Sequence, residues 1–531
     1  MPFRVRSRPP VVRLVNAFAR PFENAVATAR TCYSADGVVT PAQVSGDGLD
    51  DERRAKRAAA RDRLAKSIYA AGHHTTFQHP HLQFTLENVS RQFLWTFLHA
   101  HPFYNSEQVS QRYVTVKPDQ ACIPELGGGE AQSVYAAALR DQTAAYHALN
   151  ELLFEPAAEL FYERFRGKLK NRTKHDLDVR KRTQEAARYV LPLATFAYLY
   201  HTVSALTLLR YSRVMNQLDA PAETQAVVQA MVDAALAHDP LLKTVLEEPL
   251  PLEETPEYAH YAAYAPHRAE GLPARFRERF DASLGGRVSK LVDWKINAEP
   301  VLAESVREVF GLTPDQIGDD AAIALALDPA KSPYFGESLN LADHSKLLRT
   351  LHHPHYTFRK RLSHTADSQD QRHRMTPGSR PVLLAQQDAA PDYETPEIVR
   401  RSPAALALYV ESMERSFAAA ERLRRLGVPE EWAAYVLPNA VRVRFTESGD
   451  LAALHHKFAM RLCYNAQEEI WRATYDEFMQ LREVHPRIGS YLGPPCVLRD
   501  RAGVHPVCPE GPRFCGIVVW KQAPETWERV L

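Results

Sequence analysis

The sequence lacks any uninterrupted apolar run that approaches the length of a transmembrane helix, which argues against a bilayer-spanning segment. It also lacks the apolar stretch that a secretory signal would need after the basic start MPFRVRSRPP. Neither charge is in excess, since 65 Lys and Arg residues face 64 Asp and Glu residues, so the overall charge indicates no nucleic-acid or membrane partner. We therefore expect a cytoplasmic protein that binds neither nucleic acid nor membrane.

Cysteine is scarce as well, with six in 531 residues, and four of the six fall near the C-terminal end. Clustered cysteines in a long cytoplasmic chain indicate metal before disulfides. Pro and Gly in PPCVLRDRAGVHPVCPEGPRFCG form turns that can bring thiolates together. We predict a structural zinc site with the ligands Cys463, Cys496, Cys508 and Cys515, or with His505 as the fourth ligand. Because no CxxC pair is present, buried free thiols are the competing interpretation.

The chain contains two related halves, as its length of more than one ordinary domain allows. Three segment pairs recur in the same order: VVRLVNAFARPFENAVATAR at 11–30 with VSKLVDWKINAEPVLAESVR at 288–307, HPHLQF at 79–84 with HPHYTF at 353–358, and ARYVLP at 187–192 with AAYVLP at 433–438. The distance between matched segments falls from 277 to 246 residues along the chain, so the first copy carries extra residues before ARYVLP. We predict a tandem duplication, with a first copy at 1–250, a linker at 251–284 and a second copy at 285–531.

Periodicity predicts an α/β or α+β fold with helices in the majority and short sheets in each copy. Helical patterns occur at 53–71, 129–166, 184–213, 222–237, 403–425 and 450–482. Short strands are expected at 11–15, 81–86, 288–292, 355–360 and 516–520. The Gly-, Pro- and Asp-rich stretch 36–52 is expected to be a loop, and the Pro- and Glu-rich linker shows no sustained period.

Complementary motifs occur in the two copies. The second copy holds the triplet Arg372-His373-Arg374 and, later, LHHKFAMRLCYNAQEEIWR at 454–472. The first copy holds GHHTTFQH at 72–79, the pair Ser90-Arg91 and NSEQVSQRY at 105–113, but His99-Ala100-His101 stands where the triplet would be. Together these motifs resemble the flavin-dependent thymidylate synthase family, whose pattern is Arg-His-Arg, seven residues and Ser, usually continuing through Ser-x-Arg-Tyr.

The resemblance implies reductive methylation of dUMP to dTMP, with FAD as cofactor and with NADPH and methylenetetrahydrofolate as co-substrates. All of these ligands are anionic, and the guanidinium fork of Arg suits such groups. By resemblance, the catalytic residues would be Arg372, His373, Arg374 and Arg461. Flavin would be bound by His73, His79, Arg91, Arg372 and Arg374, and the nucleotide by Ser110, Gln111, Arg112 and Arg461.

Each copy lacks the half-motif that the other retains, so we expect one composite site between the two copies. A homodimer of tandem chains is also expected. An Arg-His-Arg triplet by itself is more often a solvated face, and SQRY can simply cap a helix or end a turn. The competing hypothesis is a catalytically inactive nucleotide- or flavin-binding or scaffolding protein. A nucleic-acid uracil methylase is disfavoured by the neutral overall charge and by the lack of a basic, aromatic-laced segment.

Overall fold

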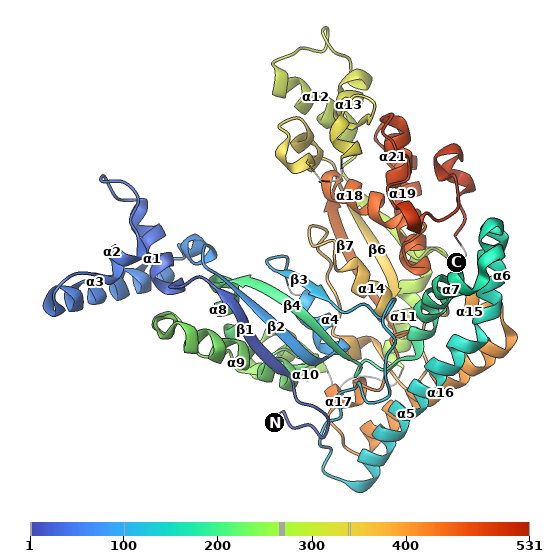
Figure 1. The fold of residues 1–531 in the computed structure, drawn as a ribbon, viewed down its shortest axis with the longest axis horizontal. Coiled ribbons are helices and arrows are strands. Elements are labelled where there is room, and N and C mark those ends of the chain that lie inside the picture. The colour runs from blue at the N-terminus through green and yellow to red at the C-terminus, as the bar shows by residue number, and fades with distance from the viewer. Residues whose placement is uncertain (1–2, 100, 265–270, 338, 340, 530) are drawn as a thin grey trace.

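Two antiparallel sheets, one in each half of the chain, organise the molecule (Figure 1). The computed structural model describes residues 3–99, 101–264, 271–337, 339, 341–529 and 531. Ala100, the centre of the first copy's triplet, and residues 265–270 of the predicted linker lie outside the described residues. No helix in the described part of the chain combines the length and the apolar character that crossing a bilayer requires.

The first sheet has the strand order β1-β2-β4-β3, with every pair antiparallel. Its strands are β1 (Val11–Ala17), β2 (His81–Ser90), β3 (Asn105–Gln108) and β4 (Phe196–Ser204). Alternate β2 residues Leu82, Phe84 and Leu86 are fully buried, so this face of the sheet carries the core. The helices that share this core are α1 (Pro21–Thr31), α4 (Arg91–His99), α8 (Ala205–Arg213) and α9 (Pro221–His238).

The second sheet repeats this plan with three strands, β5-β6-β7, again antiparallel. Its strands are β5 (Ser289–Trp294), β6 (His355–Ser363) and β7 (Arg442–Asp450). Its helices are α12 (Ala298–Phe310), α14 (His364–Asp370), α18 (Leu451–Arg461) and α19 (Glu468–Val484). Apart from additional elements, the order strand, helix, strand, helix, strand, helix, helix is the same in both halves, which fits a tandem duplication and confirms the predicted fold class.

A local two-fold axis relates the copies, and backbone hydrogen bonds on the ARYVLP and AAYVLP segments show where it passes. Leu193 N donates to Leu437 O over 2.9 Å, and Asn439 N donates to Leu191 O over 2.8 Å. Leu193 and Asn439 are counterparts 246 positions apart, and so are Leu191 and Leu437. A two-fold rotation that exchanges the copies therefore converts one hydrogen bond into the other. Pro192 pairs with its own counterpart Pro438 in an antiparallel bridge, which places both prolines at the axis.

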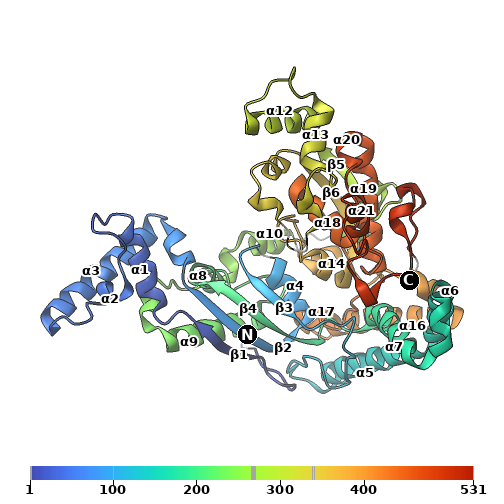
Figure 2. The ribbon, with the colours of Figure 1, turned by 45° about the horizontal axis from the view of Figure 1, so that its top comes forward.

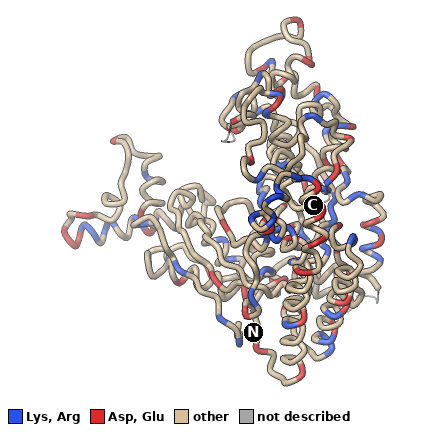
Figure 3. Tube along the Cα trace, turned by 45° about the vertical axis from the view of Figure 1, so that its right-hand side comes forward, with Lys and Arg blue, Asp and Glu red and all other residues tan. Residues whose placement is uncertain are grey.

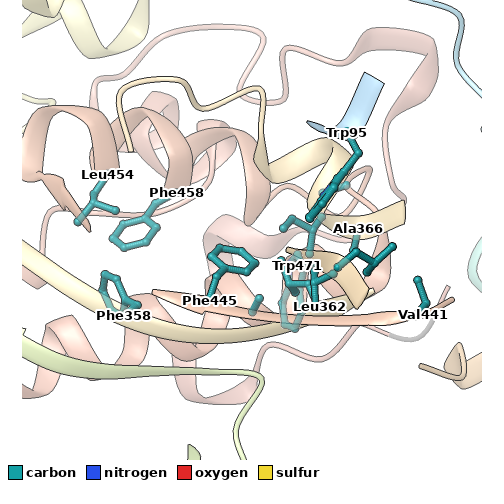
Figure 4. Close-up of a cluster of buried hydrophobic side chains, with 14 of the residues drawn as sticks. Trp95, Phe358, Leu362, Ala366, Val441, Phe445, Leu454, Phe458 and Trp471 are labelled. Carbon is teal, nitrogen blue, oxygen red and sulfur yellow. The ribbon is translucent and has the colours of Figure 1, made fainter. Parts of the chain in front are cut away.

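Helices and a shared core join the halves on either side of this axis. The long helices α5 (Gly129–Leu152) and α16 (Pro403–Arg425) pack along each other (Figure 2). Trp95 of α4 lies among buried side chains of the second copy, including Leu362, Ala366 and Trp471 (Figure 4). Its indole Nε1 donates to Asp367 Oδ2 over 2.7 Å. The copies therefore share one hydrophobic interior, as two subunits of an obligate dimer would.

The remaining helices lie outside this repeated plan. They are α2 (Pro41–Ser45), α3 (Asp51–Ala70), α6 (Phe154–Arg164), α7 (Arg172–Ala187), α10 (Pro256–Tyr264), α11 (Leu272–Leu284), α13 (Asp319–Leu327), α15 (Glu397–Arg400), α17 (Glu430–Ala434), α20 (Pro486–Gly489) and α21 (Pro495–Arg501). Helices α6 and α7 are part of the extra residues of the first copy, and the C-terminus ends beside them in both ribbon views.

Several predicted elements differ from the structure. The helix expected over 184–213 contains strand β4, and the helix expected over 450–482 is interrupted after Arg461. The strand expected at 516–520 is absent, since this stretch ends in the short 3-10 helix Val519–Lys521 and pairs with no sheet. The expected loop 36–52 contains α2 and the start of α3. The predicted linker contains α10 and α11, and the domain boundaries themselves stay a prediction.

Candidate functional site between the two copies

A buried carboxylate anchors the helix that leads into the Arg-His-Arg triplet. Glu469 on α19 accepts from Ser363 N over 2.5 Å and from Ser363 Oγ over 2.6 Å, at the start of α14. Tyr189 of the first copy donates its hydroxyl to the same carboxylate over 2.5 Å. Burial raises the pKa of Glu469 to about 7. The second copy's α14 is thus held in place by a side chain of the first copy.

The same arrangement occurs on the other side of the axis with the roles of the copies exchanged. Glu223 on α9 accepts from Ser90 N over 2.7 Å and from Ser90 Oγ over 2.5 Å. Tyr435, the counterpart of Tyr189, donates to Glu223. The motif analysis missed both glutamates and both tyrosines. The recurrence of ARYVLP and AAYVLP, each with a central Tyr, was the available signal.

The triplet follows α14 in a turn that faces the first copy. Arg374 donates to Pro102 O over 3.2 Å and to Asn105 Oδ1 over 3.3 Å, and its guanidinium lies 5.1 Å from the centre of the Tyr104 ring. His373 N donates to Asp370 O over 2.9 Å, which closes the turn. The charged segment of the second copy therefore lies against the first copy, just beyond the first copy's own diverged triplet.

Arg461, at the end of α18, joins the late helix to the triplet. Its Nε donates to His373 Nε2 over 2.7 Å and its Nη2 donates to Gln369 O over 2.9 Å. Burial lowers the pKa of His373 well below its usual range, and the charge of Arg461 acts in the same direction. His373 is therefore neutral, accepts through Nε2 and carries its proton on Nδ1.

The first copy contributes Arg112 to the same region. Its Nη2 donates to Asn465 O of the second copy over 2.7 Å, and its Nε pairs with Glu185 on α7. Its backbone N donates to Ser110 Oγ over 3.3 Å. Gln111 is buried and accepts through Oε1 from Asn439 of the second copy over 3.2 Å. The Ser110–Arg112 segment therefore also spans the interface between the copies.

These half-motifs form one cluster of positive charge. The pKa of Arg461 is lowered to about 10 by burial, with the charges of Arg372 and Arg112 acting in the same direction. Burial likewise lowers the pKa of Arg91 to about 9, helped by the charges of Arg188 and Arg372. Arg461 contacts His373, and Arg112 contacts Asn465 four residues beyond Arg461, so arginines of both copies converge in one region. Figure 3 shows Lys and Arg positions gathered near the C-terminus.

The cluster is short of compensating acid. The side chains of Arg91 and Arg188 are buried, and their Nε atoms have no hydrogen-bond partner. Buried guanidinium groups with unpaired N–H donors are costly unless an anion occupies the space between them. The arrangement therefore suits a ligand with phosphate or similar groups.

Beneath the triplet, the second copy carries a buried ionic network. The ammonium of Lys360 lies 2.5 Å from Asp370, 2.6 Å from Glu447 and 2.8 Å from Glu477, and Lys457 contacts the same three carboxylates at 3.0, 2.6 and 3.5 Å. Although burial opposes ionisation, the two ammonium groups hold the pKa of Asp370 well below its usual range. Because Asp370 lies two residues before Arg372, this network fixes the start of the triplet.

The first copy has no such network in the equivalent place. The counterparts, found from the strand registers and the constant offsets, are Leu86, Phe97, His201, Tyr211 and Met231. His201 Nε2 and the Tyr211 hydroxyl form one hydrogen bond of 3.1 Å where the second copy has Glu447 and Lys457. The first copy thus stabilises the same core mainly with apolar side chains.

The symmetry-related site on the other side of the axis has lost these arginines, although Asp367 and Arg380 form a buried ion pair of 2.9 Å beside His99. Met215 is the counterpart of Arg461, and His99 and His101 stand where the second copy has Arg372 and Arg374. Burial lowers the pKa of both His99 and His101 to about 4, so they are neutral. Instead of Ser110–Arg112, the second copy has the apolar segment 382–385. Only one of the two symmetry-related sites keeps a cluster of arginines.

A cavity of about 170 Å³ adjoins the surviving cluster. Its walls include Arg112 and Tyr189 from the first copy and Asn465 and Gln467 from the second. The predicted residues Ser110, Arg372, His373, Arg374 and Arg461 are not among its lining residues. The predicted composite site would consist of this cavity, which Arg112 lines, and of the triplet, in which Arg372 is exposed and His373 and Arg374 are partly buried.

His73 and His79 lie elsewhere. They flank a 3-10 helix before β2 and are exposed, whereas Arg91 follows β2. A ten-residue strand spans about 33 Å, so the structure does not bring these histidines to the arginine cluster of the same chain. A flavin role for them stays a prediction.

The four C-terminal cysteines line a single small cavity, together with residues of the tail, as the sequence suggested: Cys463, Cys496, Cys508 and Cys515. Within the described residues, however, no three His, Cys, Asp or Glu side chains are arranged to hold a metal ion. Burial raises the pKa of Cys463 to about 11 and that of Cys496 to about 12, so both are thiols in the metal-free protein. The predicted zinc site is not confirmed, and the side chains fit the alternative of buried free thiols.

Comparisons with known proteins agree with this architecture. The family model described as thymidylate synthase complementing protein matches residues 13–241 and 336–487, one stretch in each copy. The chain is 38% identical over 92 residues to a flavin-dependent thymidylate synthase of Sulfurisphaera tokodaii and 32% identical over 157 residues to one of Saccharolobus solfataricus. These alignments cover 17% and 28% of this chain, and the chain spans only 34% and 58% of the two relatives.

A solved structure, a UMP/dUMP methylase PolB from Streptomyces cacaoi bound with 5-Br dUMP, is 19% identical, with a TM-score of 0.30. The alignment covers 46% of this chain and 96% of that one. Because the family model matches more than half of the chain, in both copies, this protein belongs to the thymidylate synthase complementing protein family as a tandem duplication.

Proposed function

We propose that the chain is a flavin-dependent enzyme that methylates dUMP to dTMP at one composite site per chain. Methylenetetrahydrofolate would supply the carbon and NADPH the reducing equivalents. A single observation carries the proposal: arginines of both copies meet at the interface, and the buried Arg91, Arg188 and Arg529 keep N–H donors without hydrogen-bond partners. The names of the curated relatives support the same chemistry.

The proposed roles follow from position. Arg112 would bind the nucleotide phosphate, since it lines the cavity and lies at the junction of the copies. Arg461 would bind the pyrimidine, and its bond to neutral His373 would orient it. Arg372, Arg374 and Arg91 would bind flavin, which when bound and reduced supplies the hydride that completes the methyl group. No cysteine nucleophile is needed in these roles.

The structure offers a reason for one site rather than two. Duplication gives each chain two symmetry-related positions, but the arginines survive in one of them and the other carries Met215 and neutral histidines. Each copy is then free to keep only its own half of the surviving site. We also propose that two tandem chains form a homodimer. The competing proposal is a catalytically inactive binding protein.

The test uses purified full-length protein. A flavin absorbance near about 450 nm, and release of tritium from C5-tritiated dUMP in the presence of methylenetetrahydrofolate and NADPH, are the expected results. Arg112→Ala should weaken dUMP binding and Arg372→Ala should weaken flavin binding, whereas Arg415→Ala, on an exposed ion pair with Asp141, should change neither. Flavin binding without tritium release would favour the inactive binding protein. If the protein shows neither flavin absorbance nor tritium release after reconstitution with FAD, the proposal is refuted.

A further inference from the structure

The cavity beside Arg112 is built largely by segments outside the repeated plan of the two copies. The extra helices α6 and α7 of the first copy contribute Phe161, Arg182 and Glu185, and the C-terminal tail contributes Phe514 and Arg529. The tail lies beyond residue 487, where the family match ends. The tail that closes this cavity therefore lies outside the family match, whereas α6 and α7 lie within it.

Arg529 is the most unusual of these side chains. It is 4% exposed, and its Nη2 donates to Ala466 O over 2.8 Å. Its Nε and Nη1 are buried without any hydrogen-bond partner. The pKa of Arg529 is lowered to about 10 by burial, with the neighbouring charge of Arg182 acting in the same direction. One backbone contact would not need a guanidinium, so a purely structural role leaves most of this group unexplained.

Arg182 adds a second uncompensated cation. Within the described residues its guanidinium forms no hydrogen bond or ion pair, and it lies 5.7 Å from the centre of the Phe161 ring. The nearby acids are already occupied. Glu185 pairs with Arg112, and Glu468 lies 2.7 Å from Arg472 and accepts from the backbone N of Glu397.

We propose that Arg182 and Arg529 form a second oxyanion subsite in this cavity, next to Arg112, and that it takes a further phosphoryl group of the bound ligand. The ligand class would be a nucleoside diphosphate or triphosphate rather than a monophosphate alone. Guanidinium groups at both ends would grip successive phosphates, and the aromatic wall would exclude water from them. The nucleotide part of this inference rests on the proposed function, but oxyanion binding by the two arginines does not.

The subsite is tested by calorimetry on the full-length chain, with inorganic phosphate, inorganic pyrophosphate, dUMP and dUDP as probes. Wild-type protein should bind pyrophosphate, and should bind dUDP at least about tenfold more tightly than dUMP. Arg529→Gln and Arg182→Gln should each remove this preference while leaving dUMP affinity within about twofold. The matched control is Arg501→Gln, an exposed tail residue that does not line the cavity and lies 3.5 Å from Asp328, and it should behave as wild type.

Each outcome decides the question. Equal affinity of the wild type for dUMP and dUDP, or equal losses in all three variants, would overturn the subsite while leaving the proposed function standing. Pyrophosphate binding that Arg529→Gln abolishes, without any dUMP binding, would support the subsite and refute the nucleotide function. If Arg529→Gln does not fold, Arg182→Gln on the partly exposed face of α7 carries the same comparison.

Discussion

The hydroxyl of Tyr189 in the first copy donates a 2.5 Å hydrogen bond to Glu469 in the second. Tyr435 in the second copy donates in the same way to Glu223 in the first. Each tyrosine satisfies a buried carboxylate that also holds the first turn of a helix leading to a triplet position. The two copies thus position each other's functional segments, which explains why duplication preserved this contact on both sides of the axis.

Removing either hydroxyl should destabilise the whole chain. In Tyr189→Phe, Glu469 loses a partner while remaining buried, and we expect a loss of about 1–3 kcal/mol in the free energy of unfolding. Tyr435→Phe should cost a similar amount, because its environment is equivalent. The measurement is urea unfolding, with the exposed Tyr198→Phe on β4 as control. Losses no larger than that of the control would contradict the role assigned to these bonds.

Asp219 should make stability depend on pH. Burial raises its pKa from 3.8 to about 7, so the folded state holds a proton that the unfolded state releases at lower pH. The free energy of unfolding should therefore fall as pH rises from about 4 to about 7, and Asp219→Asn should reduce that fall by up to about 4 kcal/mol. Unfolding at a series of pH values checks this. Parallel curves for wild type and variant would refute it.

The buried ionic network should be sensitive to the loss of one member. Lys360→Leu introduces the first copy's residue but leaves three carboxylates around one ammonium, and we expect a loss of about 3–5 kcal/mol. Converting all five network positions to their first-copy counterparts should cost less than the sum of the five single changes, since it restores an apolar core. Thermal unfolding of the single and combined variants measures this. Strict additivity would show that the residues do not act as one network.

Arg461→Met gives the surviving site the residue of the degenerate one. It removes a guanidinium from the site, so dUMP affinity should fall at least about tenfold, while the fold is retained. Met215→Leu, at the symmetry-related position, is the matched control and should leave affinity unchanged. Binding is measured by calorimetry. Equal effects of the two substitutions would mean that the sites are not differentiated.

Much of this architecture could be predicted from the sequence because the recurring segments lie on the elements that pair. HPHLQF and HPHYTF begin β2 and β6, and their constant offset is reproduced in the strand registers. Strands β4 and β7 were harder to detect. In β4 the buried residues alternate, but His201 among them breaks the apolar pattern, and β7 buries Glu447. In a sequence, a charged residue is interpreted as exposed unless the partners that allow its burial are known.

The site was only partly predictable for the same reason. Arg112, Arg372 and Arg461 belong to motifs, and the structure brings them near one another. Glu469 and Arg188 lie within quoted segments but nothing there marks them out, and Arg529 belongs to no motif. The importance of all three comes from burial at an interface between distant segments. The cysteines converge as their turns suggested, but within the described residues no three potential ligands are arranged to hold a metal ion.

The stoichiometry of dUMP binding tests the central proposal, one composite site for each pair of copies, most directly. Equilibrium dialysis with labelled dUMP on the full-length chain should give one site per chain, and both Arg112→Ala in the first copy and Arg461→Met in the second should weaken that same site. Two sites per chain, or a site that one of the two substitutions leaves untouched, would contradict the account.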